Sequence, residues 1–235
     1  TSLCEAYTKA LSCDTTSAFG GIIALNQIID KDSAAEIIKI FTEVIIAPGI
    51  TDEAKEIFES KSNLRILILP TLHEKSRSQN YKSIEGGILV QTNDSEETIK
   101  SDLKIVTQNK PSDHQIEDML FAFKVCKHVK SNAIIYVKNK KTIGIGAGQM
   151  SRVDSAKIAS QKNSEMDPSD ENSLKDSVVA SDAFFPFADG LLVTIESGAK
   201  AVIQPGGSVK DEEVIAAADE AGISMVFTGK RHFKH

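Results

Sequence analysis

Short apolar runs alternate with helical segments along the whole chain, and this alternation is the feature that most constrains the fold. The runs are rich in Ile and Val, and several are stopped by proline or glycine, as Val44–Ala47 is by Pro48 and Gly49. Runs of this kind are typical of buried strands, while the segments between them carry apolar residues at helical spacing. Strand–helix alternation favours a largely parallel sheet covered on both faces. We therefore expect an α/β protein.

The expected elements follow from these patterns. The expected strands are Ile22–Leu25, Val44–Ala47, Arg65–Leu69, Ile88–Gln91, Leu103–Thr107, Ala133–Val137, Thr142–Ile145, Ala201–Gln204 and Ser224–Thr228. The expected helices are Ser2–Leu11, Ser33–Thr42, Thr51–Ser60, Ile116–Lys127, Val153–Gln161, Leu191–Ser197 and Asp211–Ala221. Polar residues 73–82 and 162–175 are expected to be surface loops. A hinge at Lys110-Pro111-Ser112 divides the chain into lobes at residues 1–109 and 110–235.

Composition and charge exclude several classes of protein. The 27 basic and 33 acidic residues give a formal charge of −6, which argues against a nucleic-acid-binding protein. No apolar run approaches the ~18 residues of a membrane span. The three cysteines form no C-x-x-C pair, so neither a disulfide framework nor a zinc site is indicated. We expect a cytoplasmic protein, and a fragment, because Thr1 opens directly on a helical pattern without methionine.

The stretch Ser181–Gly190, S-D-A-F-F-P-F-A-D-G, is the first candidate for a binding site. Three phenylalanines surround a proline, which disfavours a helix interior or a central strand here. Asp189 is expected to be a helix N-cap, because an apolar-periodic run follows it. Aromatic faces beside the carboxylates of Asp182 and Asp189 suit a planar, nitrogen-rich ring. The alternative is a buried aromatic cluster capped by a helix N-terminus.

A glycine-rich turn between an expected strand and an expected helix is the second candidate. Gly144, Gly146 and Gly148 are followed by Gln149, Ser151 and Arg152. The spacing is not G-x-G-x-x-G, and no acidic residue closes a following strand, so we expect no nicotinamide cofactor. A glycine bend, a helix N-terminus and an arginine can together hold an anion or a polarised carbonyl.

Two further segments have functional and ordinary interpretations. Gly20 and Gly21 permit close approach of a ligand or another chain, although a pair of glycines before a strand is more often a bend. Arg231, His232 and His235 follow the last expected strand, where parallel sheets bind ligands. The alternative for this basic tail is a solvent-exposed terminus.

Several long motifs occur in order and carry a resemblance to a known family. They are S-A-F-G-G, F-T-E-V-I-I-A-P, K-S-N-A-I-I-Y, I-G-I-G-A-G-Q-M-S-R, S-D-A-F-F-P-F, I-Q-P-G-G-S and T-G-K-R-H-F-K-H. From Thr1 to His235 the chain resembles the transformylase portion of the bifunctional AICAR transformylase/inosine monophosphate cyclohydrolase family. The resemblance implies two tandem cytidine-deaminase-like lobes with mixed sheets covered by helices, in a homodimer whose active sites lie at the subunit interface. The deaminase zinc signature is absent from the sequence.

The resemblance also implies an activity, namely formyl transfer from 10-formyltetrahydrofolate to the amine of the ribotide AICAR in purine biosynthesis. Asn132 would orient the carboxamide of AICAR as a supporting catalytic residue, Arg152 would bind near it, and Phe184 would stack on the imidazole. Arg231 would hold the 5′-phosphate. The remaining ligand contacts implied by the resemblance are Gly20 and Glu43 for the ribotide, and Val153, Asp189 and Ser208 for the folate.

Three departures from the family pattern affect this expectation. A Lys-His pair followed by Asn-Pro-Cys-Gly lies upstream of the first helix in the family, and it is the catalytic centre; this chain does not contain it. The cyclohydrolase domain is also absent from the chain. Ala188 stands where the family usually has arginine. The alternative function is therefore a catalytically inert module that binds ribotide or folate.

Overall fold

The computed structural model describes residues 2–71, 79–166, 168 and 173–234. The chain forms two compact units, Thr1–Glu96 and Glu97–His235. This division falls earlier than the lobe boundary expected after residue 109. The reason is that β6 (Lys104–Ile105) pairs antiparallel with β11 (Ser224–Phe227), the last strand of the second unit. Residues on the amino-terminal side of the expected hinge therefore belong to the second unit.

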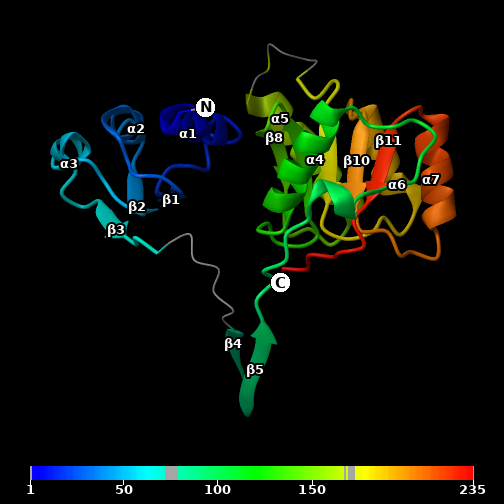
Figure 1. The fold of residues 1–235 in the computed structure, drawn as a ribbon, viewed down its shortest axis with the longest axis horizontal. Helices are drawn as coiled ribbons and strands as arrows, with labels where there is room; N and C mark the ends of the chain where they lie inside the picture. The colour runs from blue at the N-terminus through cyan, green and yellow to red at the C-terminus, as the bar shows by residue number, and fades with distance from the viewer. Residues whose placement is uncertain (1, 72–78, 167, 169–172, 235) are drawn as a thin grey trace. The chain divides into compact units, whose positions relative to one another are not determined.

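The first unit contains a three-stranded parallel sheet in the order β1-β2-β3, with three helices (Figure 1). The strands are β1 (Gly21–Ala24), β2 (Thr42–Ala47) and β3 (Arg65–Ile68), and the helices are α1 (Leu3–Leu11), α2 (Lys31–Ile37) and α3 (Asp52–Phe58). Each helix begins after a capping side chain, Ser2, Asp30 or Thr51, that accepts a hydrogen bond from a backbone N–H of the first turn. The strands, α1 and α3 match the expected elements within two residues, whereas α2 ends at Ile37, five residues before the expected Thr42.

The helices of this unit pack on one face of its sheet. Ile23, Ile45 and Ile66 are aligned across the three strands and belong to the core that the helices cover. On the opposite face Ile22 is 73% and Leu67 is 53% exposed. The expectation of cover on both faces is therefore wrong for this unit. Successive strands are added in one direction, and right-handed crossovers then place α2 and α3 on the same side.

A two-stranded antiparallel sheet follows, formed by β4 (Gln79–Ile84) and β5 (Gly87–Thr92). The second strand confirms the expected run at Ile88–Gln91. The expectation of a loop at residues 73–82 is wrong from Gln79 onward, because these polar residues form strand β4 of the hairpin. Residues 73–78 lie outside the described residues. Every residue of both strands is exposed.

The second unit is built on a six-stranded mixed sheet in the order β6-β11-β10-β9-β7-β8. Its remaining strands are β7 (Ile134–Lys138), β8 (Lys141–Gly146), β9 (Val178–Ser181) and β10 (Ala201–Gln204). Its helices are α4 (Asp113–Cys126), α5 (Arg152–Met166), α6 (Ala188–Glu196), α7 (Asp211–Glu220) and a short 3-10 helix, η1 (Lys100–Asp102). Strands β9, β10 and β11 are parallel, whereas β6, β7 and β8 pair antiparallel with their neighbours. The fold is α/β with a mixed sheet.

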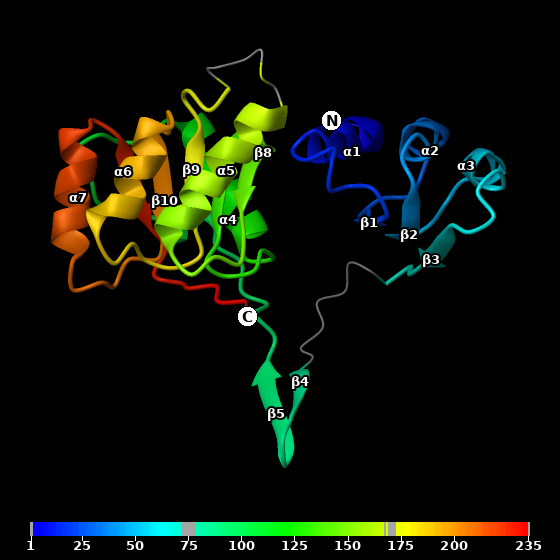
Figure 2. The same ribbon diagram turned by 180° about the vertical axis from the view of Figure 1, so that it is seen from behind.

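Helices cover both faces of this sheet, as expected. Helix α4 lies in front of the sheet in Figure 1, and α5 and α6 lie in front of it in Figure 2. Alternate residues of β7 belong to the hydrophobic cores on the two faces of the sheet. Ile134 and Tyr136 pack on the side of α5, α6 and α7, and Ile135 and Val137 pack on the side of α4. All four are fully buried. This two-sided burial explains the continuous apolar run of β7.

Strand β9 was not among the expected elements, although it lies between β10 and β7 in the sheet. It is four residues long and follows a polar segment directly. Its residues are all buried. Within the described part of the chain, no helix combines the length and apolar character needed to cross a membrane.

Candidate functional site

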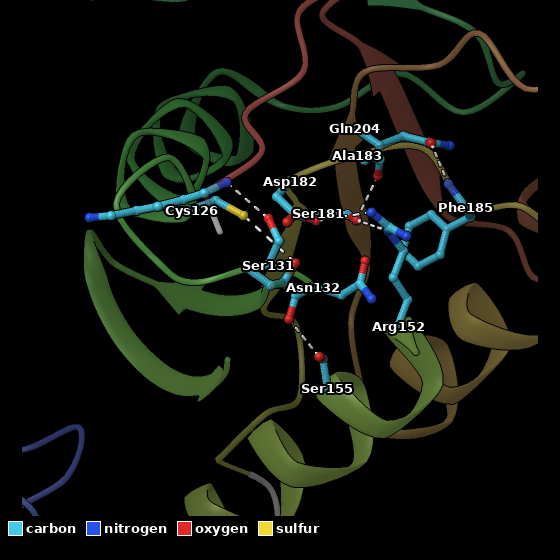
Figure 3. Close-up of polar contacts among 12 residues, drawn as sticks. Cys126, Ser131, Asn132, Arg152, Ser155, Ser181, Asp182, Ala183, Phe185 and Gln204 are labelled. Carbon is cyan, nitrogen blue, oxygen red and sulfur yellow. Dashed lines mark hydrogen bonds and ion pairs between the residues drawn. The ribbon is translucent and has the colours of Figure 1, made fainter. Parts of the chain in front are cut away.

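Four chain segments meet at one edge of the six-stranded sheet (Figure 3). The parallel strands β9, β10 and β11 end at this edge, and β7, which runs antiparallel to β9, begins there. The segment before β7 supplies Asn132, the segment after β8 supplies Arg152, and the ends of β9 and β11 supply the aromatic loop and the C-terminal tail. The carboxyl ends of parallel strands are the usual ligand-binding edge of such sheets.

Asn132 is fixed by the loop that precedes α5. Its Nδ2 donates hydrogen bonds to the carbonyl oxygens of Gln149 at 2.9 Å and Met150 at 3.1 Å. Its own carbonyl oxygen accepts from Ser155 Oγ at 2.8 Å, which ties it to α5. With both amide protons used, the side-chain Oδ1 is the acceptor that Asn132 can offer to a ligand.

Arg152, the first residue of α5, reaches the end of β9. Its Nε donates to Ser181 Oγ and its Nη2 donates to Asp182 Oδ1, both at 3.1 Å. Burial lowers the pKa of the Arg152 guanidinium, and the neighbouring Asp182 charge opposes that change. Asp182 is fully buried. The hypothesis that Asp182 faces a ligand ring is therefore wrong, because its carboxylate is turned inward to Arg152.

The glycine-rich turn has a packing role that the sequence did not reveal. A Cβ on Gly146 would lie 1.9 Å from the Ser155 carbonyl oxygen, and one on Gly144 would lie 2.6 Å from that of Ala159. These glycines let β8 pack directly against the backbone of α5. At the start of α5, Ser151 Oγ accepts from the Asp154 N–H at 3.0 Å, so one of the helix's amide donors is already satisfied.

The aromatic loop divides into core and surface residues. Phe185 is fully buried, Phe184 is partly buried and Phe187 is 55% exposed. The Phe185 N–H donates to Gln204 Oε1 at 3.0 Å, which anchors the loop to the end of β10. The interpretation as a buried aromatic cluster therefore describes Phe185 but not Phe187.

Two of the residues expected on the folate side, Asp189 and Ser208, lie at the starts of α6 and α7. Asp189 is not the N-cap of α6, because the helix already begins at Ala188 and Phe187 takes the cap position. The exposed Asp189 lies in the first turn, where its carboxylate accepts from the Gly190 N–H at 2.7 Å. Ser208 is half-buried in the turn before α7, and its N–H donates to Asp211 Oδ1 at 3.2 Å.

The C-terminal tail lies across the same edge. Ser131 and Lys234 exchange two hydrogen bonds, from the Ser131 N–H to the Lys234 carbonyl and from the Lys234 N–H to Ser131 Oγ. His232 is 3% exposed, and its N–H donates to the Asp182 carbonyl at 3.0 Å. The alternative of a wholly solvent-exposed tail is therefore wrong at His232; His235 lies outside the described residues.

Phe233 links the two arginines of the site. Its ring centroid lies 4.7 Å from Cζ of Arg231 and 6.0 Å from Cζ of Arg152. Both distances are within the range of cation–π contacts. Val153 follows Arg152 on α5 and is partly buried. The structure thus brings Asn132, Arg152 and Arg231 to one edge.

Gly20 and Glu43 lie in the first unit. The Gly20 N–H donates to the Phe41 carbonyl at 2.8 Å, and Gly20 has a φ of +73°, a conformation that glycine adopts without strain. Glu43 is exposed on β2, one residue after Thr42, which pairs with Gly21. These two predicted residues are therefore close to each other in the first unit, while all the other predicted site residues belong to the second.

Sequence reasoning missed Ser131, Gln204 and Phe233 as parts of this edge, and it included Ser181 in the aromatic stretch without giving it a role. A signal for Ser181 existed in Val178–Ala180, a short β-branched run whose end places Ser181 at the carboxyl edge of the sheet. In the described part of the chain, no group of three or more His, Cys, Asp or Glu side chains could hold a metal ion.

Comparison with known proteins identifies the family. Residues 1–162 match the model of the AICARFT/IMPCHase bienzyme family. The chain is 58% identical over its full length to the bifunctional purine biosynthesis protein PurH of Rhodospirillum rubrum, covering 45% of that protein. It is 57% identical to the PurH of Chelativorans sp. and 59% identical to that of Bartonella henselae, in each case over 44% of the relative. The chain thus spans somewhat less than half the length of these relatives, and it belongs to the AICARFT/IMPCHase bienzyme family.

Proposed function

We propose that this protein is a phosphoribosylaminoimidazolecarboxamide formyltransferase, which transfers a formyl group from 10-formyltetrahydrofolate to the amine of AICAR ribotide in purine biosynthesis. The observation that carries the proposal is the meeting of Asn132, Arg152 and the aromatic loop at the carboxyl edge of the sheet. Membership of the family supports the same activity. We place this activity in the cytoplasm.

The ribotide would bind against the second unit. The Oδ1 of Asn132 is the acceptor for the carboxamide N–H₂ of AICAR, since both Nδ2 protons are used by Gln149 and Met150. The Arg152 guanidinium donates to the carboxamide oxygen. Phe184 offers a ring face to the imidazole. Arg231 is exposed beside Phe233 and pairs with the 5′-phosphate, for which a planar guanidinium is well suited.

The folate and the remaining ribotide contacts complete the proposal. Val153, Asp189 and Ser208 line the folate side, with the exposed Asp189 carboxylate accepting from the pterin. Gly20 and Glu43 are further proposed contacts of the ribotide. We further propose that the two units are cytidine-deaminase-like lobes, and that the protein works as a homodimer in which both subunits contribute to each site.

The chemistry requires more than binding. The AICAR amine is attached to an aromatic ring and is a poor nucleophile, so the site must remove its proton and stabilise charge on the attacked formyl group. Asn132 and Arg152 orient the acceptor, and a positioned acceptor lowers the barrier through proximity. The family places its Lys-His pair upstream of the segment that this chain matches. For the segment matched here, which covers 45% of the relative, a ribotide- and folate-binding module without turnover is the second candidate.

One experiment decides between the two candidates. Single-turnover formyl transfer would be measured with this chain and with the same chain extended upstream through the Lys-His pair, using 10-formyltetrahydrofolate and AICAR ribotide. Transfer by both proteins supports the formyltransferase, and transfer by the extended protein alone supports the binding module for this segment. If neither protein transfers the formyl group or binds the ribotide in calorimetry, the proposed function is wrong.

A further inference from the structure

Two buried acceptors at the end of β9 hold the guanidinium of Arg152. Asp182 Oδ1 accepts from Nη2, and Ser181 Oγ accepts from Nε. The Ser181 hydroxyl donates its own proton to the Ala183 carbonyl at 2.7 Å, so its lone pairs are directed to the arginine. The side chain of Arg152 is 11% exposed and that of Asp182 is 0% exposed. The two acceptors therefore fix the plane of the guanidinium from the protein side.

The second oxygen of the Asp182 carboxylate has an unusual environment. Oδ2 is buried without a hydrogen-bond partner in the described part of the chain. The neighbouring thiol of Cys126 is fully buried, and its pKa is raised by burial first and by the Asp182 charge second. A buried carboxylate with one unsatisfied oxygen is expensive, and replacing such ion pairs by apolar residues often leaves stability unchanged or improves it. Stability alone does not explain an ionic pair at this position.

We propose that Asp182 is a positioning residue for Arg152. The carboxylate holds Nη2, and Nη1, for which the described residues show no hydrogen bond, is left to donate to the ligand. This role rests on the proposed function, because the ligand it orients Arg152 toward is the carboxamide of AICAR ribotide. A planar guanidinium held by two hydrogen bonds donates in a fixed direction. An arginine without such bonds loses conformational entropy when it binds a ligand.

The backbone of Asp182 makes a hydrogen bond of its own, so the role of the side chain can be tested without removing that bond. Its carbonyl accepts from the His232 N–H, and that bond holds the tail that carries Arg231 and Phe233. Asp182→Asn preserves the backbone bond, the size of the side chain and one acceptor oxygen, and it removes the charge. Its effect on the site is therefore expected to pass through Arg152 and not through the tail.

The test combines a ligand-free measurement with a binding measurement on the full chain. NMR of arginine-nitrogen-labelled protein should show slowly exchanging Arg152 Nε–H and Nη2–H signals, assigned by their loss in Arg152→Lys. The Nη2–H signal should be lost in Asp182→Asn and the Nε–H signal in Ser181→Ala, because these groups donate to Asp182 Oδ1 and to Ser181 Oγ respectively. The matched control is Asp118→Asn, since Asp118 is also buried but accepts from the N–H groups of Asn139 and Lys140 in the β7–β8 turn. The control should retain both signals.

Calorimetric titration with AICAR ribotide supplies the second measurement. Asp182→Asn should weaken binding roughly tenfold, within the range of coupled neighbouring residues, with a melting temperature no lower than that of Asp118→Asn. In an Arg152→Ala background the same substitution should change the affinity no further. An additive loss in that background, or an Arg152 Nη2–H signal that persists unchanged in Asp182→Asn, would overturn the proposal. A parent chain that binds no ribotide would count against the proposed function, and the NMR signal would still decide the role of Asp182.

Discussion

Phe184 and Phe185 are adjacent in the chain but have different surroundings. Phe185 is fully buried and belongs to the core under α6, whereas Phe184 is partly exposed in the loop. Phe185→Ala should destabilise the fold by about 3–5 kcal/mol, as large core truncations do. Phe184→Ala should instead weaken AICAR ribotide binding by roughly 1–3 kcal/mol, through lost stacking and apolar contact, with little change in the melting temperature.

Thermal melts and ribotide titrations of both variants check this separation. The two phenylalanines serve as controls for each other, because the side chain removed is the same and only its environment differs. A melting temperature that falls as far in Phe184→Ala as in Phe185→Ala would place Phe184 in the core and remove it from the proposed site.

At the residue scale, the sequence predicts which side chains lie at the site better than it predicts where those side chains point. Asp182 was identified as one of the carboxylates beside the aromatic residues, but the structure turns it inward. Arg152 lies 30 positions earlier in the chain, and its approach depends on how α5 packs on β8. Pairings of this kind follow from tertiary packing and leave no local pattern in the sequence.

The position of helix α5 is set by the close packing that Gly146 permits. A Cβ at this position would lie 1.9 Å from the Ser155 carbonyl oxygen, which is a backbone atom and cannot move aside without shifting the helix. Gly146→Ala should therefore destabilise the second unit by about 1–3 kcal/mol or more, as overpacking does. Because Arg152 begins α5, and Ser155 of the same helix bonds the backbone carbonyl of Asn132, ribotide affinity should fall as well.

Gly87→Ala is the matched control for this prediction. Gly87 also lies in a strand, and a Cβ there would have no atom within 4 Å in the described structure. Urea unfolding of both variants against the parent measures the difference. Equal stability of Gly146→Ala and the parent would show that α5 adjusts freely, and would remove the packing explanation for this glycine.

At the scale of elements, the sequence predicted most helices and strands, with ends shifted by a few residues. Helices with clear caps, such as α4 after Ser112, were placed well because capping is a local signal. Strand β9 was missed because a four-residue run gives little periodicity to detect. The polar residues of β4 favour a solvated loop, so the sequence alone does not indicate a strand there.

At the scale of the whole molecule, the alternation of strands and helices predicted an α/β fold correctly but not the cover of each sheet. The first unit leaves one face of β1-β2-β3 without helices, since its strands are added in one direction. The sequence carried no signal for the order of strands in either sheet. That order depends on non-local pairing, which is why the boundary expected after residue 109 and the observed division at Glu96 differ.

The proposed homodimer leads to the last prediction. The β4–β5 hairpin exposes Tyr81, Ile88 and Val90, and a two-stranded sheet is at best marginally stable alone in water. Burying such a surface against a second copy would contribute the missing apolar contacts. Sedimentation velocity at micromolar concentration should therefore give a dimer for the parent. Val90→Lys should shift it toward monomer, because a charge would have to be buried at the interface.

Gln91→Lys provides the control for the hairpin. Gln91 pairs with Asn80, whereas Val90 pairs with Tyr81, so the two substitutions place the same charge on opposite faces of one strand. The control should sediment as the parent does. A monomeric parent would argue against the homodimer itself. A dimer that is equally stable in the parent and both variants would keep the homodimer but move its interface away from the Tyr81 and Val90 face.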